Sequence, residues 1–226
     1  MTEKPTTATT KERILDAAEH LFAEKGFAQT SLRDITAEAG ANLAAVNYHF
    51  QSKEALIDAM FARRIGPVNE ERLAMLDRFE EEASGGPVPV ECILRAFIEP
   101  VFRLVGTPEG AGAARLIGRM FVEPGDVFSR MFVGQFAPTV ARFMAAARRA
   151  LPEVPETELY WRIHFAIGVM GHTVSGLRHI AVTSGGRCDI TDVDAISDRL
   201  VAFVAAGVKA PLNPARKGET PCKGSR

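Results

Sequence analysis

The chain has 226 residues, of which 46% are hydrophobic and 24% charged, and its formal net charge is −1. These values exclude a disordered polyelectrolyte and a uniformly basic nucleic-acid coat protein, and they allow a sizeable core. No apolar run approaches the ~18 residues of a membrane span, and residues 1–10 are polar, so the sequence predicts a cytoplasmic protein without a membrane partner. Cys92, Cys188 and Cys222 lack CxxC spacing, which argues against a disulfide framework or a zinc site.

Apolar residues recur every three or four positions along nearly the whole chain, which predicts an all-α fold. The first four helices are each expected to follow a capping residue. They are a helix over about 10–25 after Thr9, a short helix from Ser31 to Gly40, a segment over 43–50 after Asn42, and a helix over 53–65 after Ser52. Gly66 and Pro67 are expected to end the fourth helix.

Longer helices are predicted beyond that point, with boundaries set by glycine and proline. Their expected ranges are 68–83, 89–105, 110–122, 125–135, 138–151, 155–182 and 192–206. We expect three parts: a DNA-binding domain over residues 1–51, a helical effector-binding and dimerisation domain over 52–210 with the fourth helix as connector, and a disordered tail over 211–226.

The spacing between residues 31 and 56 predicts a helix-turn-helix, because a glycine turn there separates two short capped helices. The segments 13–18 (RILDAA), 21–27 (LFAEKGF), 30–40 (TSLRDITAEAG) and 46–56 (VNYHFQSKEAL) resemble the N-terminal DNA-binding signature of the TetR family of transcriptional repressors. The resemblance covers about residues 10–60. It implies a homodimer in which each N-terminal domain reads half of a roughly palindromic operator, while the larger helical domain dimerises and binds an effector.

The resemblance places Arg33, Tyr48 and Lys53 at phosphate-contacting positions, and Arg, Lys and Tyr side chains suit that role. The candidate DNA-binding residues are Ser31, Arg33, Asn42, Leu43, Ala44, Ala45, Asn47, Tyr48, His49 and Lys53. Asn47 stands where the family usually has Tyr, so both an adenine contact and a phosphate bond stay open for it. Residues 1–64 hold eight Lys/Arg and nine Asp/Glu, so binding must rely on local geometry and on two half-sites. The alternative is a helical hairpin without a ligand.

Aromatic, methionine and isolated polar residues in the second part suggest an elongated apolar cavity with a polar group at its mouth. The candidate ligand-binding residues are Arg115, Arg119, Met120, Phe128, Met131, Phe132, Gln135, Phe136, Trp161, His164, Phe165 and His172. A buried Arg would favour a carboxylate or phosphate. Alternatively, the aromatic side chains only pack in the core, and each Arg pairs with Glu123 or Glu99.

A narrower resemblance concerns the effector. The segments 42–50 (NLAAVNYHF), 158–165 (ELYWRIHF) and 175–177 (SGL) resemble the PsrA-type TetR regulators, which respond to long-chain fatty acids or their thioesters. This resemblance implies an acyl effector, and a non-acyl effector is the alternative.

Small residues along the helix predicted over 155–182 and apolar residues on the next helix indicate close packing against another helix pair. The candidate dimerisation residues are Gly168, Gly171, Ser175, Gly176, Leu200, Phe203 and Val204. TetR-like proteins dimerise through such a four-helix bundle. Packing within one subunit is the alternative.

Other function classes find little support. The sequence lacks GxSxG, HExxH, P-loop and dinucleotide-binding motifs, so we expect neither an enzyme nor a cofactor. His164, His172 and His179 are about two turns apart, which argues against a shared metal ion. A helical protein-binding adaptor stays open. From residue 207 onward the chain has a local excess of four positive charges, which is expected to be solvated and which can alternatively touch DNA or a partner.

Overall fold

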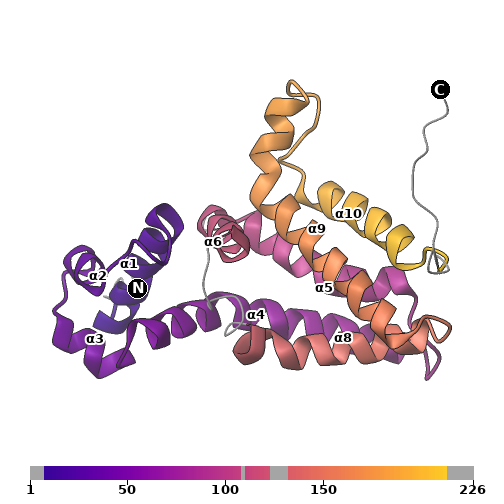
Figure 1. Ribbon diagram of the computed structural model, residues 1–226, viewed down its shortest axis with the longest axis horizontal. Helices are drawn as coiled ribbons and strands as arrows, with labels where there is room; N and C mark the ends of the chain where they lie inside the picture. The colour runs from indigo at the N-terminus through magenta and orange to yellow at the C-terminus, as the bar shows by residue number, and fades with distance from the viewer. Residues whose placement is uncertain (1–7, 108–109, 123–131, 213–226) are drawn as a thin grey trace, which may run out of the picture.

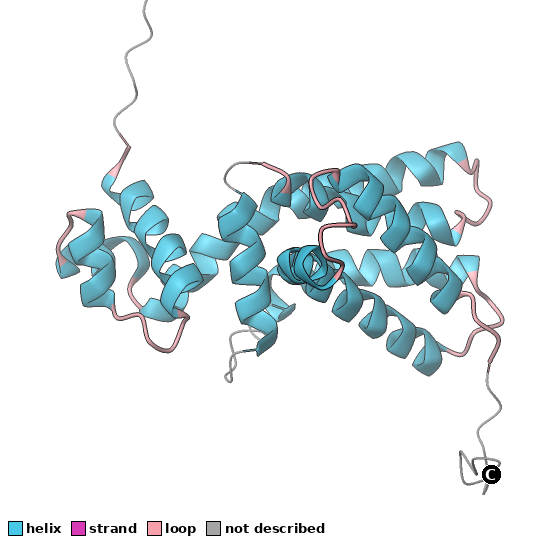
Figure 2. Cartoon of the chain, turned by 90° about the horizontal axis from the view of Figure 1, so that it is seen from above, coloured by secondary structure: helices cyan, strands magenta, loops and turns pink. Residues whose placement is uncertain are grey.

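The computed structural model describes residues 8–107, 110–122 and 132–212, and in these ranges every regular element is a helix, as Figures 1 and 2 show. The all-α prediction is therefore confirmed. The elements are α1 (Thr10–Lys25), α2 (Leu32–Ala39), α3 (Leu43–Phe50), α4 (Lys53–Glu82), α5 (Val90–Val105), α6 (Gly110–Val122), a π-helical turn η1 (Phe132–Phe136), α8 (Ala137–Ala150), α9 (Glu156–Thr183) and α10 (Val193–Val208).

Helices α1 to α3 form a compact group at one end of the molecule, and their boundaries agree with the sequence-based prediction (Figure 1). The hydroxyl oxygens of Thr9 and Ser31 each accept a hydrogen bond from the backbone N–H three residues later, which fixes the starts of α1 and α2. Gly40 ends α2 in the left-handed conformation, with φ +58°, which a residue with a Cβ rarely adopts. This residue provides the turn between α2 and α3.

The predicted break at residues 66–67 is wrong, because α4 continues through both residues as one 30-residue helix. Pro67 lacks the N–H that would bond to the carbonyl of residue 63, and a proline inside a helix costs about 3 kcal/mol. The helix persists because Ile65 and Val68, on either side of the proline, are both buried and pack in two different hydrophobic clusters. At 1.5 Å per residue, α4 is roughly 45 Å long and extends from the N-terminal helices along α8 (Figure 1).

The larger group of helices surrounds α5, which packs against α4, α8, α9 and α10. Its main core combines Leu94 and Phe102 of α5 with Leu159 of α9 and with Leu200 and Val204 of α10. Helix α6 lies between the two groups and contacts α1 on one side and α9 on the other (Figure 1). This position makes α6 a second connection, besides α4, between the two groups of helices.

Several expectations concern residues outside the described ranges. Most of the helix expected over 125–135 lies there, and its described part, residues 132–135, belongs to η1. The tail expected over 211–226 also lies there, apart from Pro211 and Leu212. None of the described helices has the length and hydropathy of a membrane span.

Candidate nucleic-acid interface and internal cavity

Helix α3 is held rigidly at its start and along one face. The Asn42 side-chain oxygen accepts a hydrogen bond from the Ala45 backbone N–H at 2.9 Å, which caps the helix. Val46 and Phe50, four residues apart, are buried in the core formed with α1, α2 and α4. The side of α3 away from this core is therefore left to face outward.

The outward face of α3 carries most of the residues that the sequence analysis placed at the DNA interface. Tyr48 is 83% exposed and Leu43 46%, and Ala44 and Asn47 are also exposed. Ala45 is half-buried against the core, so its predicted base contact is the least accessible of the group. The face has the size of two helical turns and offers an amide, a phenol and small apolar groups, which are side chains that can contact base edges and phosphates.

Arg33 and Lys53 differ in what they already bind. Arg33 is exposed on α2, and its guanidinium has no hydrogen bond or ion pair with any other described residue, whereas its backbone carbonyl oxygen accepts a hydrogen bond from the Thr36 hydroxyl at 3.0 Å. The Lys53 ammonium donates a hydrogen bond to the Phe27 carbonyl oxygen at 2.5 Å and lies 5.8 Å from the centre of the Phe22 ring. Lys53 therefore stabilises the group of N-terminal helices, and its remaining N–H groups are the ones available to a phosphate.

The capping carboxylates in these helices are engaged in local hydrogen bonds. The Ser31 hydroxyl donates to the Asp34 carboxylate at 2.6 Å, and this hydrogen bond, followed by that from the Ser31 backbone, holds the Asp34 pKa below its ordinary value. Hydrogen bonds from Thr9 lower the pKa of Glu12 in the same way. The Ser31 side chain is thus engaged in capping α2. The phosphate contact predicted at Ser31 would therefore be made by backbone N–H groups at the start of α2.

Two further ionic contacts join α1 to its neighbours. His20 lies 2.6 Å from Glu38 of α2 and 3.3 Å from Glu24, and the hydrogen bond with Glu38 raises the His20 pKa. Glu19, which is nearly buried, accepts hydrogen bonds from Arg63 at 2.9 Å and from Arg64 at 2.8 Å. The Glu19 carboxylate therefore holds α1 against the middle of α4.

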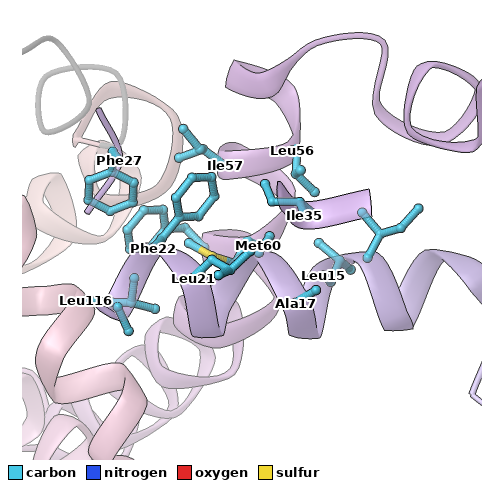
Figure 3. Packing of buried hydrophobic residues seen from close by; sticks show 14 of the residues in the cluster. Leu15, Ala17, Leu21, Phe22, Phe27, Ile35, Leu56, Ile57, Met60 and Leu116 are labelled. Carbon is cyan, nitrogen blue, oxygen red and sulfur yellow. The ribbon is translucent and has the colours of Figure 1, made fainter. Parts of the chain in front are cut away.

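The core of the N-terminal helices also includes two residues of α6. Leu116 and Met120 belong to the same cluster as Phe22, Ile57 and Met60, and Figure 3 shows Leu116 reaching this cluster from the α6 ribbon. The Arg119 guanidinium donates to the Glu24 carbonyl oxygen at 2.7 Å. A displacement of α6 would therefore disturb the packing of the helices that position α3.

A cavity of about 70 Å³ lies inside the larger group of helices. Residues from six elements line it: Ile65 and Arg72 of α4, Phe97 and Val101 of α5, Ile117 and Met120 of α6, Phe136 of η1, Val140 of α8, and Ile167, Met170, Gly171 and Val174 of α9. Met120 thus belongs both to the cavity wall and to the core of the N-terminal helices.

Two family models match the chain. Residues 14–60 match the bacterial regulatory proteins of the tetR family, and residues 95–207 match the tetracyclin repressor-like C-terminal domain. The chain belongs to the tetR family. The resemblance found in the sequence is thereby confirmed at the level of the family, which is one of regulatory proteins rather than enzymes.

Curated transcriptional regulators match part of the chain. The HTH-type transcriptional repressor BepR of Brucella suis is 30% identical over 139 residues, which are 62% of this chain and 59% of BepR. The HTH-type transcriptional regulator TtgR of Pseudomonas putida is 30% identical over 98 residues, which are 42% of this chain and 43% of TtgR. The chain thus spans about half the length of these two relatives.

Solved structures share the fold over nearly the whole chain. FadR, a fatty acid degradation regulator from Bacillus halodurans, covers 93% of this chain and aligns over 100% of its own, with a TM-score of 0.56 and 15% identity. FadR from Bacillus subtilis, in complex with stearoyl-CoA, covers 86% of this chain and aligns over 97% of its own, with a TM-score of 0.53 and 16% identity. At these identities the similarity establishes the arrangement of the helices.

The cavity of this tetR-family chain contains only some of the ligand-binding residues expected from the sequence. Met120 and Phe136 line it. Arg115 is exposed on α6, and Arg119 bonds to α1, so neither provides the polar group of the cavity. The Gln135 carbonyl oxygen accepts a hydrogen bond from Asn69 at 2.8 Å, whereas the Gln135 side chain does not line the cavity. Phe128, Met131 and the side chain of Phe132 lie outside the described part.

The α9 residues predicted to bind ligand instead face outward. Trp161 is 60% and Phe165 59% exposed, and their rings stack with centroids 5.9 Å apart. His164 and His172 are exposed on the same side of the helix. None of these four residues lines the cavity, because the stripe of α9 that faces it is formed by Ile167, Met170, Gly171 and Val174.

Sequence analysis missed Arg72, the cationic residue of the cavity wall. Its guanidinium is buried, with 1% of the residue exposed. Arg72 follows two glutamates, and the segment looks like a solvated helix face when it is considered alone. The signal was the helical period: Ile65, Val68, Arg72, Met75 and Leu76 occupy one buried stripe of α4.

The predicted dimerisation residues divide into two groups. Phe203 is 69% exposed, and Gly168 has open space beside its Cα. Leu200 and Val204 are instead buried in this chain's own core, and Gly171 lines the cavity, so these three do not face a partner. Ser175 lies opposite Gly118 of α6. A Cβ added to Gly118 would lie 2.9 Å from the Ser175 Cβ, so the small Ser175 side chain allows α6 and α9 to pack closely within the chain. Gly176 is half-buried.

Proposed function

We propose that the chain is a homodimeric DNA-binding repressor, which a small apolar or amphipathic effector releases from a palindromic operator. The observation that carries the proposal is the outward face of α3, where exposed Leu43, Ala44, Asn47 and Tyr48 lie on a capped helix fixed by Val46 and Phe50. In this proposal residues 1–51 bind DNA, residues 52–210 bind the effector and form the dimer, and residues 211–226 are a solvated tail.

The connection between cavity and α3 supports the release mechanism. An effector changes DNA binding only if it binds the two states of the repressor with different affinities. Filling the cavity would displace Met120 or Ile65, and both residues also pack in the core beneath α1 and α3. Movement along α4 and α6 would then change the spacing of the two recognition helices, so that they no longer fit successive major grooves.

An acyl compound is the first candidate effector. The cavity lining is apolar except for Arg72, which suits an aliphatic chain. The resemblance to PsrA-type regulators suggests a fatty acid or its thioester, and the FadR structure with stearoyl-CoA has the same arrangement of helices. A non-acyl effector remains the alternative that the experiment below distinguishes.

The homodimer would form through α9 and α10. Trp161, Phe165 and Phe203 give these helices an exposed aromatic surface, and Gly207 lines the groove between them. A partner's side chains can enter the groove, which has a volume of about 270 Å³. Large exposed apolar patches of this kind mark interaction sites, and two-fold packing of the two helix pairs would cover the surface.

Fluorescence anisotropy with DNA from the gene's own upstream region tests the function directly. The full chain is expected to bind a specific fragment in competition with bulk DNA, and palmitate or palmitoyl-CoA is expected to release it. Specific binding that neither compound affects would reject the acyl effector and retain the regulator. Absence of specific binding would favour the protein-binding adaptor.

Arg33→Ala is expected to reduce the slope of log K against log salt concentration by about 0.9, because one phosphate contact is lost. Thermal stability should remain unchanged, since the Arg33 side chain makes no hydrogen bond or ion pair with other described residues and the bond from Thr36 to its backbone carbonyl is retained. Titrations at four salt concentrations measure the slope, and an unchanged slope would remove Arg33 from the phosphate contacts.

Lys53→Ala, compared with Arg33→Ala, separates a phosphate contact from a structural role. It is expected to weaken operator binding and to reduce the salt slope by about one, and also to lower the Tm, because the hydrogen bond to the Phe27 carbonyl is lost. A lower Tm with an unchanged slope would restrict Lys53 to its structural role.

A further inference from the structure

The Arg72 guanidinium occupies an unusual position for a charged group. Its Nε donates to the Phe97 carbonyl oxygen at 2.8 Å, and one terminal nitrogen donates to the Asn69 side-chain oxygen at 3.0 Å. The other terminal nitrogen lies 3.9 Å from the Met170 sulfur, a weak acceptor. The guanidinium also lies over the Phe97 ring, 4.1 Å from its centre. These contacts fix the group in the cavity wall.

No carboxylate of the described residues forms an ion pair with Arg72. A guanidinium has five N–H donors, and the three contacts to Phe97, Asn69 and Met170 leave two of them without a described acceptor. Burying a charge without a counter-ion is costly, and buried charges are normally paired. Arg162, the other buried arginine among the described residues, pairs with the Glu158 carboxylate at 3.0 Å.

Arg72 remains a cation under ordinary conditions. Burial lowers its pKa to about 9, because the charged form loses its hydration, and this value is still above neutral pH. A cation held in an apolar cavity attracts an anion strongly, and the planar guanidinium suits the two oxygens of a carboxylate.

The volume of the cavity limits the size of the ligand that can bind inside it. Its volume of about 70 Å³ exceeds the ~10–15 Å³ that one water requires. It is well below the ~300–1,000 Å³ typical of sites for drug-sized ligands, so a bulky nucleotide such as that of coenzyme A does not fit inside. Met120 and Met170 in the wall are flexible side chains that can adapt to a longer aliphatic chain.

We propose that the cavity binds a free carboxylic acid, with its carboxylate on the Arg72 guanidinium and its aliphatic body against the apolar wall. This inference rests on the proposed effector role of the cavity and restricts the effector from acyl compounds in general to free carboxylic acids. A thioester has no carboxylate at its acyl end, so the free acid, rather than the coenzyme A ester, is the ligand.

Isothermal titration calorimetry on the full chain tests this assignment with butyrate, octanoate, palmitate, octanamide and octanoyl-CoA. At least one of the acids is expected to bind, and octanoate to bind roughly 10- to 100-fold more tightly than octanamide, since the amide lacks the charge. Octanoate affinity is expected to fall above about pH 9 as Arg72 loses its proton. This comparison uses the unaltered protein, so it does not depend on the folding of a variant.

Arg72→Met should lose the preference for octanoate over octanamide, while Arg115→Met, a substitution on the exposed side of α6, should retain it. Equal affinity for acid and amide, tighter binding of octanoyl-CoA than of octanoate, or binding of no acid would overturn the proposal.

Operator binding, measured separately by anisotropy, distinguishes a failure of the carboxylic-acid proposal from a failure of the proposed repressor function. Specific DNA binding without acid binding would reject this inference and retain the repressor. Acid binding without specific DNA binding would retain the inference and reject the repressor.

Discussion

A chain carrying both Asn47→Ala and Tyr48→Ala is expected to lose about 30- to 20,000-fold in operator affinity. Each base or phosphate contact of this kind contributes about 1–3 kcal/mol, and 1.4 kcal/mol corresponds to tenfold. Both side chains are exposed and outside the core, so the Tm should change little. Anisotropy with the specific fragment and with unrelated DNA measures the loss and shows whether it is greater for the specific sequence.

Tyr160→Ala is the matched control for that variant. Tyr160 is 54% exposed on α9, among the helices of the larger group, so its removal is expected to leave DNA affinity unchanged. If the double variant retained operator affinity with a normal Tm, the outward face of α3 would not be the DNA-binding surface.

If the chain forms the homodimer proposed above, Phe203→Glu is expected to make it a monomer at micromolar concentration. Phe203 is 69% exposed beside Phe165 in the groove between α9 and α10, and a carboxylate buried in the proposed interface would lose its hydration without gaining a counter-ion. Operator affinity should then fall by about 100-fold or more, because one half-site contact replaces two. Sedimentation velocity measures the mass of the particle, and anisotropy measures the affinity.

Tyr160→Glu provides the corresponding control, since the helical repeat turns Tyr160 about 100° away from Trp161. This variant should remain a dimer. An unaltered chain that sediments as a monomer would reject the homodimer, and a dimeric Phe203→Glu variant would reject this surface as its interface.

The sequence allowed the N-terminal helices to be predicted closely, because their limits depend on local chemistry. Thr9, Ser31 and Asn42 each bond to a backbone N–H three residues away, and Gly40 adopts a left-handed conformation. Capping residues and turn glycines act on residues that are only a few positions away in the sequence, so they can be recognised without the rest of the fold.

The errors arose where distant residues decide the outcome. Pro67 stays helical because residues on both sides of it are buried against other elements. The expectation that proline ends a helix takes no account of such packing. Trp161, expected to bind the ligand, is exposed away from the cavity, and Leu200, expected to face a partner, packs in the chain's own core, since an apolar residue alone does not reveal which neighbour covers it. Arg72 follows two glutamates and was not among the predicted site residues, although its position in the apolar period of α4 indicates burial.

The double membership of Met120, in the cavity wall and in the core beneath α3, also constrains how such a protein can evolve. For the effector-controlled repressor proposed above, a substitution at this position that adapts the cavity to a new compound would also alter the affinity of the unliganded protein for its operator. Ligand preference and basal expression of the target gene would then be inherited together at this residue. Compensating changes would be expected at Leu116 or Phe22, which share the same core but do not line the cavity.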